Sequence, residues 1–299
     1  MEWSGARRGG RGPSRGLANW LKTGVLLAGM TALVLVIGQL LGGSQGLLLA
    51  AIFALVMNGV SYWFSDKIAL KAYRAQPLPR EQAPEIHEMV ERLARKAEIP
   101  APPIYLVESP APNAFATGRN PEHAAVAVTT GILRLLDRRE LEGVLAHELS
   151  HVKNRDTLVS TVAATLAGMI VSLAAIVRWG AILGAGRDER QGGGLYLLAM
   201  AIVAPFAAML LQFAVSRSRE YGADGSGGAL TGDPDALADA LQKLENGARR
   251  FPDDRHPATA SLWMVNPLSR RGLNALFSTH PPTEERVARL RTTGRGAWR

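Results

Sequence analysis

The residues with the clearest chemical potential are His147, Glu148 and His151, which form the pattern His-Glu-x-x-His. On a helix, positions four apart lie on the same face, so the two imidazoles can bind one metal ion. Glu148 then lies beside the water molecule that such an ion activates. Roughly one chain in a hundred of this composition would contain the pattern by chance. The pattern is typical of zinc peptidases, and two histidines on an ordinary surface helix are the alternative.

A catalytic zinc ion needs a third protein ligand and one open position for water. The chain contains no cysteine, so this ligand must be His, Asp or Glu. The candidate is Glu220, because Asp224 lies four residues later on the same helical face, where it can accept the second ring N–H of a ligating histidine. A solvated glutamate at a helix end is the alternative. We therefore expect one Zn²⁺ per chain, bound by His147, His151 and Glu220.

Two further segments are candidates for the same site. His280 precedes two prolines, and a rigid backbone there would let its side chain donate to the oxyanion formed during peptide hydrolysis. A turn histidine that caps the terminal helix is an equally good interpretation. The segment Asn113-Ala114-Phe115-Ala116 could be an exposed edge strand that binds a peptide through main-chain hydrogen bonds. The simpler alternative is a strand in the core.

Four apolar runs have about the length that crosses a bilayer, which is roughly 20 helical residues. They are residues 23–41, 46–64, 158–177 and 195–215. The first two are joined by only four residues, which predicts an antiparallel helical hairpin. A cleaved signal peptide is disfavoured, because the first run is too long and the second follows at once. The later pair either crosses the bilayer or forms a hairpin packed on protein, and both arrangements return the chain to the same side.

The charge distribution indicates a membrane rather than a nucleic acid as the partner. The formal net charge is +8, with much of the excess in residues 1–22, directly before an apolar run. Basic residues also follow the second run, at Lys67, Lys71 and Arg74. Because positive residues flank cytoplasmic ends, both ends of the hairpin are expected in the cytoplasm.

The remaining sequence reads as a mainly α (α+β) domain with a small sheet. Helical periodicity covers residues 79–98, and short strands are expected at 104–108, 113–117 and 124–129. Asp137 is expected to cap the helix that carries the His-Glu-x-x-His pattern, and further helices should begin near residues 233 and 283. The predicted parts are a basic cytoplasmic arm (1–22), a transmembrane helical hairpin (23–64) and a zincin-like metallopeptidase domain (75–299) interrupted by an apolar hairpin (158–215).

Taken together, these motifs resemble those of the HtpX-type integral-membrane zinc endopeptidases, relatives of the CAAX prenyl endopeptidases. The resemblance covers nearly the whole chain and rests on residues 113–116, 147–151 with 154–156, 216–221 with 223–224, 266–268 and 277–286. It implies that His280 acts in the active site and that Arg286, Asn154 and Asp224 support the ligands. One departure is the glycine-rich run 225–228, which is unusual in a helix that should continue and puts the rigidity of that segment in question.

The resemblance also implies an activity and a location. The chain would be a multi-pass protein of the bacterial inner membrane, with its N-terminus and catalytic domain in the cytoplasm. It would cleave misfolded or damaged membrane proteins, so polypeptides and the lipid bilayer are its expected partners and nucleic acid is not. A CAAX-type processing protease and a non-catalytic membrane scaffold are the alternatives. Glu148 argues against the scaffold, which needs no base beside a metal ion. The sequence does not predict the oligomeric state.

Overall fold

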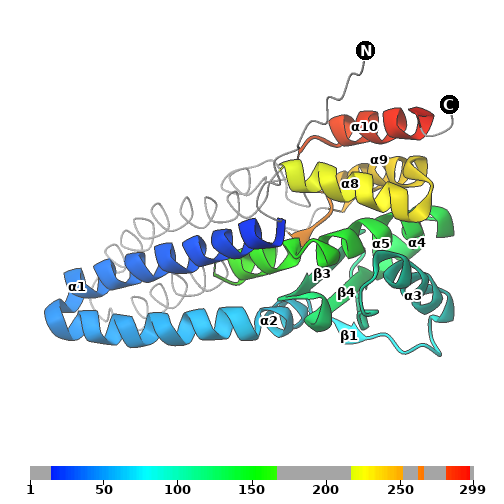
Figure 1. Cartoon of the computed structure of the whole chain (residues 1–299). Helices are drawn as coiled ribbons and strands as arrows, with labels where there is room; N and C mark the ends of the chain where they lie inside the picture. The colour runs from blue at the N-terminus through cyan, green and yellow to red at the C-terminus, as the bar shows by residue number, and fades with distance from the viewer. Residues whose placement is uncertain (1–14, 167–216, 252–261, 266–280, 297–299) are drawn as a thin grey trace, which may run out of the picture.

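The computed structural model describes residues 15–166, 217–251, 262–265 and 281–296, and this part is mainly helical with one small sheet, as the sequence predicts (Figure 1). The helices are α1 (Arg15–Trp63), α2 (Ser65–Ala72), α3 (Pro84–Ala97), α4 (Thr130–Leu135), α5 (Arg138–Lys153), α8 (Arg217–Thr231), α9 (Pro234–Arg250) and α10 (Thr283–Gly296). The strands are β1 (Gln76–Pro77), β2 (Ile104–Val107), β3 (Ala114–Gly118) and β4 (Ala124–Thr129), and a 3-10 turn, η1, spans Pro121–His123. A further helical segment covers Asp156–Leu166.

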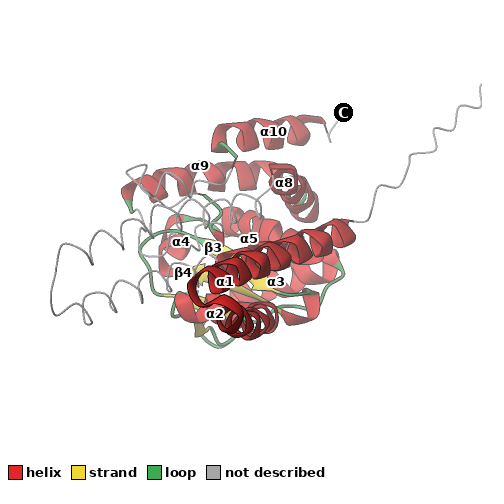
Figure 2. Cartoon of the chain, turned by 90° about the vertical axis from the view of Figure 1, so that its left-hand side faces the viewer, coloured by secondary structure: helices red, strands yellow, loops and turns green. Residues whose placement is uncertain are grey.

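Helix α1 consists of two arms that fold back on each other (Figures 1 and 2). The reversal is at Gly43, whose φ of 57° and ψ of −139° are not helical. Glycine adopts a positive φ without a steric penalty, so this residue can end one arm and start the next. Across the hairpin, Asn58 Nδ2 donates to Thr31 Oγ1 at 2.7 Å. The hairpin expected from the four-residue connection is therefore present.

Among the described residues, Gly43–Trp63 is the one helix long and apolar enough to cross a membrane. Several large apolar side chains on it are exposed, including Leu55 at 76% and Leu49 at 68%. A contiguous exposed apolar face of this kind marks contact with a membrane or another protein. Most of the run 158–177 and all of 195–215 lie outside the described residues, so the four predicted spans stay a prediction.

The sheet has the strand order β1-β2-β4-β3 and is mixed: β2 and β4 are parallel, and the other neighbours are antiparallel. Strand β3 therefore lies at an edge of the sheet, although its side chains are buried. The Thr129 N–H donates to the Asn113 carbonyl at 2.9 Å, which makes this a hydrogen-bonded pair. Because such pairs alternate in an antiparallel ladder, the main-chain groups of Ala114, Ala116 and Gly118 point away from β4.

Helix α5 lies between this sheet and the group formed by α8, α9 and α10 (Figure 1). It begins with a capping box, in which Asp137 accepts the Glu140 N–H at 2.9 Å and Glu140 accepts the Asp137 N–H at 3.0 Å. The cap predicted at Asp137 is confirmed. Leu145 and Leu149 are fully buried in the core on which the sheet and α9 pack. The helix that carries the motif is thus held on several sides.

The glycine-rich run 225–228 lies inside α8, which continues without a break to Thr231. At Gly227 a Cβ atom would lie only 2.9 Å from the backbone nitrogen of His147. At Gly228 it would lie 2.9 Å from Cβ of Pro234. These glycines let α8 approach α5 and the start of α9 closely, so the run serves helix packing. The sequence put the rigidity of this segment in question, but the contacts of α8 with α5 and α9, which the sequence does not show, hold the helix in place.

Replacing Gly227 by alanine should therefore destabilise the protein, because the new methyl group must displace backbone of α5. Overpacking costs about 1–3 kcal/mol, more than the gain of up to about 1 kcal/mol in helix propensity. Gly225→Ala is the matched control, since a Cβ there meets nothing within 4 Å. Thermal unfolding of the purified protein should show a lower Tm for Gly227→Ala only. Equal Tm values for the two variants would contradict the close approach.

Candidate metal centre

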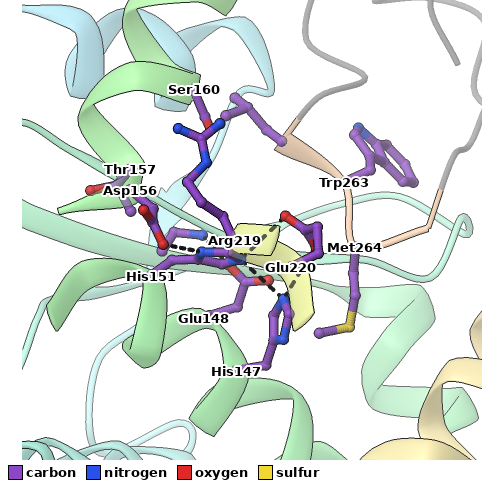
Figure 3. Close-up of a pocket in the computed structure, with 12 residues that line it drawn as sticks. His147, Glu148, His151, Asp156, Thr157, Ser160, Arg219, Glu220, Trp263 and Met264 are labelled. Atoms are coloured by element: carbon purple, nitrogen blue, oxygen red, sulfur yellow. Dashed lines mark hydrogen bonds and ion pairs between the residues drawn. The ribbon is translucent and has the colours of Figure 1, made fainter. Parts of the chain in front are cut away.

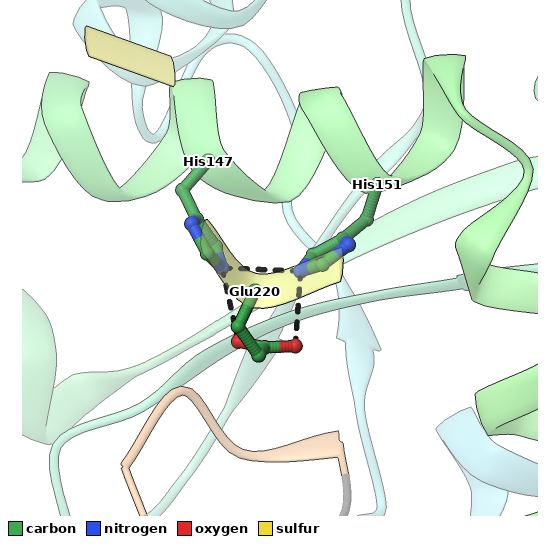
Figure 4. Close-up of side chains that lie close together, drawn as sticks. All are labelled: His147, His151 and Glu220. Atoms are coloured by element: carbon green, nitrogen blue, oxygen red, sulfur yellow. Dashed lines mark hydrogen bonds and ion pairs between the residues drawn. The ribbon is translucent and has the colours of Figure 1, made fainter. Parts of the chain in front are cut away.

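Three side chains that are far apart in the sequence converge at one point (Figure 4). His147 and His151 project from one face of α5, and Glu220 projects from the first turn of α8. Their possible ligand atoms all lie within 4.8 Å of one another. The Nε2 atoms of the two histidines are 3.1 Å apart. The Glu220 carboxylate oxygens lie 3.7 Å from His147 Nε2 and 3.6 Å from His151 Nε2.

These distances fit a tetrahedral metal ion. Ligand bonds of about 2.0–2.1 Å place neighbouring ligand atoms about 3.3 Å apart in a tetrahedron. The three observed separations, 3.1, 3.6 and 3.7 Å, lie around that value. Two imidazoles and one carboxylate are also the ligand set of many catalytic zinc sites. The residues present therefore fit a zinc ion, and the group brings together the three ligands expected from the sequence.

Each histidine has a carboxylate beside its Nδ1 atom. His147 Nδ1 lies 2.9 Å from Asp224 Oδ1, and His151 Nδ1 lies 3.1 Å from Asp156 Oδ2. A carboxylate that accepts the Nδ1–H directs the lone pair of Nε2 towards a metal ion. Burial also lowers the pKa of His147, which favours the neutral imidazole that a metal requires. Asp156 thus fixes the direction of the His151 ring by a hydrogen bond, and Asp224 lies close enough to His147 to pair with it.

Arg286 joins α10 to this arrangement. Its guanidinium is fully buried and donates two hydrogen bonds to Asp224, at 2.9 and 2.7 Å, and a third to the Met264 carbonyl at 2.9 Å. Burial acts to raise the pKa of Asp224, but Arg286 outweighs it and lowers that pKa to about 2. Nη1 of Arg286 also lies 3.8 Å from Glu220. The structure thus places Asp224 and Arg286 directly behind the candidate metal ligands, as expected from the sequence.

Glu148 lies beside the three ligands but faces the sheet. Its Oε2 accepts the Ala116 N–H from the outer edge of β3 at 2.8 Å. Burial raises the pKa of Glu148 to about 7, against the opposing influence of His151 and of this hydrogen bond. A carboxylate with a pKa near neutrality is suited to accept a proton and then return it.

The ligands open onto a cavity of about 40 Å³ (Figure 3). By volume, this space holds about three water molecules. Its walls are formed by Ala116, His147, Glu148, His151, Asp156, Thr157, Ser160, Arg219, Glu220, Leu262, Trp263 and Met264. The wall thus combines the motif helix, strand β3, the start of α8, the helical segment after α5 and the short segment 262–265.

Several other residues predicted for the site do not line this cavity in the described part of the chain. Asn113 accepts the Met264 N–H at 3.2 Å, and Phe115 packs against the Tyr73 ring at a centroid distance of 5.1 Å. Asn154 forms the C-cap of α5 and does not line the cavity. His280 lies outside the described residues. The contact of Asp156 with His151 was not expected from the sequence, although its place just after the motif is the signal that could have indicated it.

The fold and the site define a metallopeptidase. A model of peptidase family M48 matches residues 80–294 of the chain. The chain belongs to this family. It is also similar to proteins named "Protease HtpX homolog": one from Desulforapulum autotrophicum is 54% identical, with 92% of this chain and 90% of that protein covered, and one from Syntrophobacter fumaroxidans is 56% identical, with 91% and 98% covered. The HtpX-type resemblance is confirmed.

Among solved structures, S. mikatae Ste24p matches with a TM-score of 0.48 and 17% identity. The match covers 92% of this chain and 66% of Ste24p.

Removing the charge behind His151 should weaken metal binding. In an Asp156→Asn variant the amide cannot fix the imidazole as strongly, so zinc affinity should fall about 10- to 100-fold. Competition with a chromogenic chelator measures this affinity directly. Asp235→Asn, on the exposed side of α9, is the matched control. If the two variants bind zinc equally well, the Asp156 contact does not support the ligand.

Proposed function

We propose that the protein is a zinc-dependent endopeptidase that cleaves misfolded or damaged membrane proteins at the cytoplasmic face of the bacterial inner membrane. The observation that supports this best is the convergence of His147, His151 and Glu220 beside the buried carboxylate of Glu148. Zinc is favoured because the ligand set is two imidazoles and one carboxylate, without thiolates.

A bound zinc ion supplies Lewis acidity: it polarises the scissile carbonyl and lowers the pKa of water towards neutrality. The protein's own residues carry the proton. Glu148 accepts it from the attacking water and donates it to the leaving amine, since burial holds the pKa of this carboxyl at about 7. The Ala116 N–H keeps one carboxylate oxygen in place during the transfer. His280 is proposed to donate to the oxyanion.

Strand β3 is the proposed binding surface for the peptide. The main-chain groups of Ala114 and Gly118 and the Ala116 carbonyl point away from β4, while the Ala116 N–H is bonded to the carboxylate of Glu148. A substrate strand added antiparallel to β3 would be held by main-chain hydrogen bonds, which tolerate many sequences. Such tolerance suits an enzyme that removes damaged proteins.

The hairpin supports a membrane location for this chemistry. The exposed apolar face of Gly43–Trp63 ends at Trp63, and the basic residues Lys67 and Lys71 follow on α2. Aromatic and basic residues at the end of an apolar helix are typical of the cytoplasmic interface. Arg119, which follows β3, stacks over Trp63 with 4.9 Å between its guanidinium carbon and the ring centroid. Because Arg119 links the end of β3 to Trp63 at this interface, the site would lie close to the membrane surface.

Glu148→Gln should abolish proteolysis without removing the metal. The amide cannot accept the proton, and the loss of general acid–base catalysis should lower the rate of cleavage by about 10²- to 10⁴-fold. The measurement is cleavage of casein and of an unfolded membrane protein by the detergent-solubilised, zinc-loaded chain. Zinc content, determined by mass spectrometry, should be unchanged.

Glu142→Gln is the control for this variant, because Glu142 lies on the same helix but pairs with Arg92 near the surface. Its activity should match that of the wild type. If Glu148→Gln retains full activity, the proton must be carried by another group and the assignment is wrong.

A further inference from the structure

One cation in the catalytic cavity has no part in the steps proposed above. Arg219 precedes Glu220 on α8, yet its side chain lines the cavity rather than projecting fully into solvent. In Figure 3 it runs away from the converging ligands, towards the side on which Ser160 lies. Asp156 and Glu220 attract it and help to hold it there. The cavity wall therefore contains a guanidinium, beside the carboxylates of Asp156 and Glu220, that proton transfer does not require.

Two hydroxyl groups share this part of the wall. Thr157 and Ser160 lie one turn apart on the helical segment Asp156–Leu166, and both line the cavity. Thr157 is buried, and its Oγ1 has no hydrogen-bond partner among the described residues. A buried hydroxyl without a partner is unfavourable, so a hydrogen-bond acceptor that reached Oγ1 of Thr157 would satisfy it. Asp156, which also lines the cavity, is bonded to His151.

The wall formed by Arg219, Thr157 and Ser160 lies on the side of the cavity where the amino-terminal part of a bound peptide would run. Thr161, on the same helical segment, lies 3.2 Å from Thr117 through their hydroxyl oxygens, so the segment packs against the C-terminal end of β3. A peptide antiparallel to β3 has its amino-terminal side at that end. The wall then faces the substrate residue just before the bond that is cut.

We propose that Arg219, Thr157 and Ser160 form a subsite that selects an aspartate or glutamate side chain in the substrate residue immediately before the scissile bond. A carboxylate accepts hydrogen bonds from the guanidinium and from hydroxyl groups, and its charge complements that of Arg219. This inference rests on the proposed peptidase function and adds a substrate preference to it.

The test uses quenched fluorescent peptides that differ only in the residue before the scissile bond, which is Glu, Gln, Leu or Lys. The full-length, zinc-loaded chain in detergent should cleave the Glu peptide with a kcat/KM about 10- to 100-fold above that of the Leu peptide, as expected for hydrogen bonds to a charged group. Mass spectrometry confirms the position of the cut. Arg219→Gln should bring the Glu-to-Leu ratio of kcat/KM close to one.

Arg217→Gln is the matched control, because Arg217 lies on the same turn of α8 but is exposed, and it should keep the wild-type ratio. An equal loss on all peptides in Arg219→Gln would show that Arg219 only positions its neighbours and would overturn the proposal. A wild-type chain that prefers Leu, or that selects an acidic residue only after the cut, would overturn it too. If no peptide is cleaved in a Glu148-dependent manner, the proposed function itself fails and this subsite with it.

Discussion

The close packing of α8 against α5 is the contact on which the rest of the site depends. It is possible because Gly227 has no side chain where the helix passes the backbone of His147. The same approach places Glu220 opposite the two histidines and Asp224 behind one of them. Arg286 then ties α10 to this pair of helices through buried hydrogen bonds to Asp224. A metal ion bound between α5 and α8 would link two helices that are already in contact.

The second constraint is the position of Glu148, the proposed catalytic base, between the candidate metal ligands and the sheet. Glu148 turns towards β3 and accepts an N–H from the edge that a peptide would use. Strand β3 in turn packs on α2, which continues from the apolar hairpin. One short strand thus connects Glu148, the proposed peptide surface and the apolar hairpin. This arrangement places the proposed chemistry next to the apolar hairpin.

Sequence reasoning predicted those parts of the site whose geometry is local. The i, i+4 spacing of His147 and His151 and the cap at Asp137 follow from helix geometry alone. Glu220 and Asp224 could be proposed from their own spacing and the family resemblance, although they lie about 70 positions away. The contact of Asp156 with His151 was not foreseen. It depends on the turn after α5, where Arg155 adopts a left-handed φ of 58° and the chain reverses so that the Asp156 side chain reaches His151. The packing role of Gly227 depends on a contact between distant segments, which no local pattern reveals.

Zinc K-edge X-ray absorption of the purified wild-type chain, combined with metal quantification, measures whether His147, His151 and Glu220 hold a single zinc ion. We expect one zinc per chain, with two imidazole ligands and oxygen ligands at about 2.0–2.2 Å. A chain that retains no metal after purification in zinc-containing buffer, or a coordination shell with fewer than two imidazoles, would exclude this metal site.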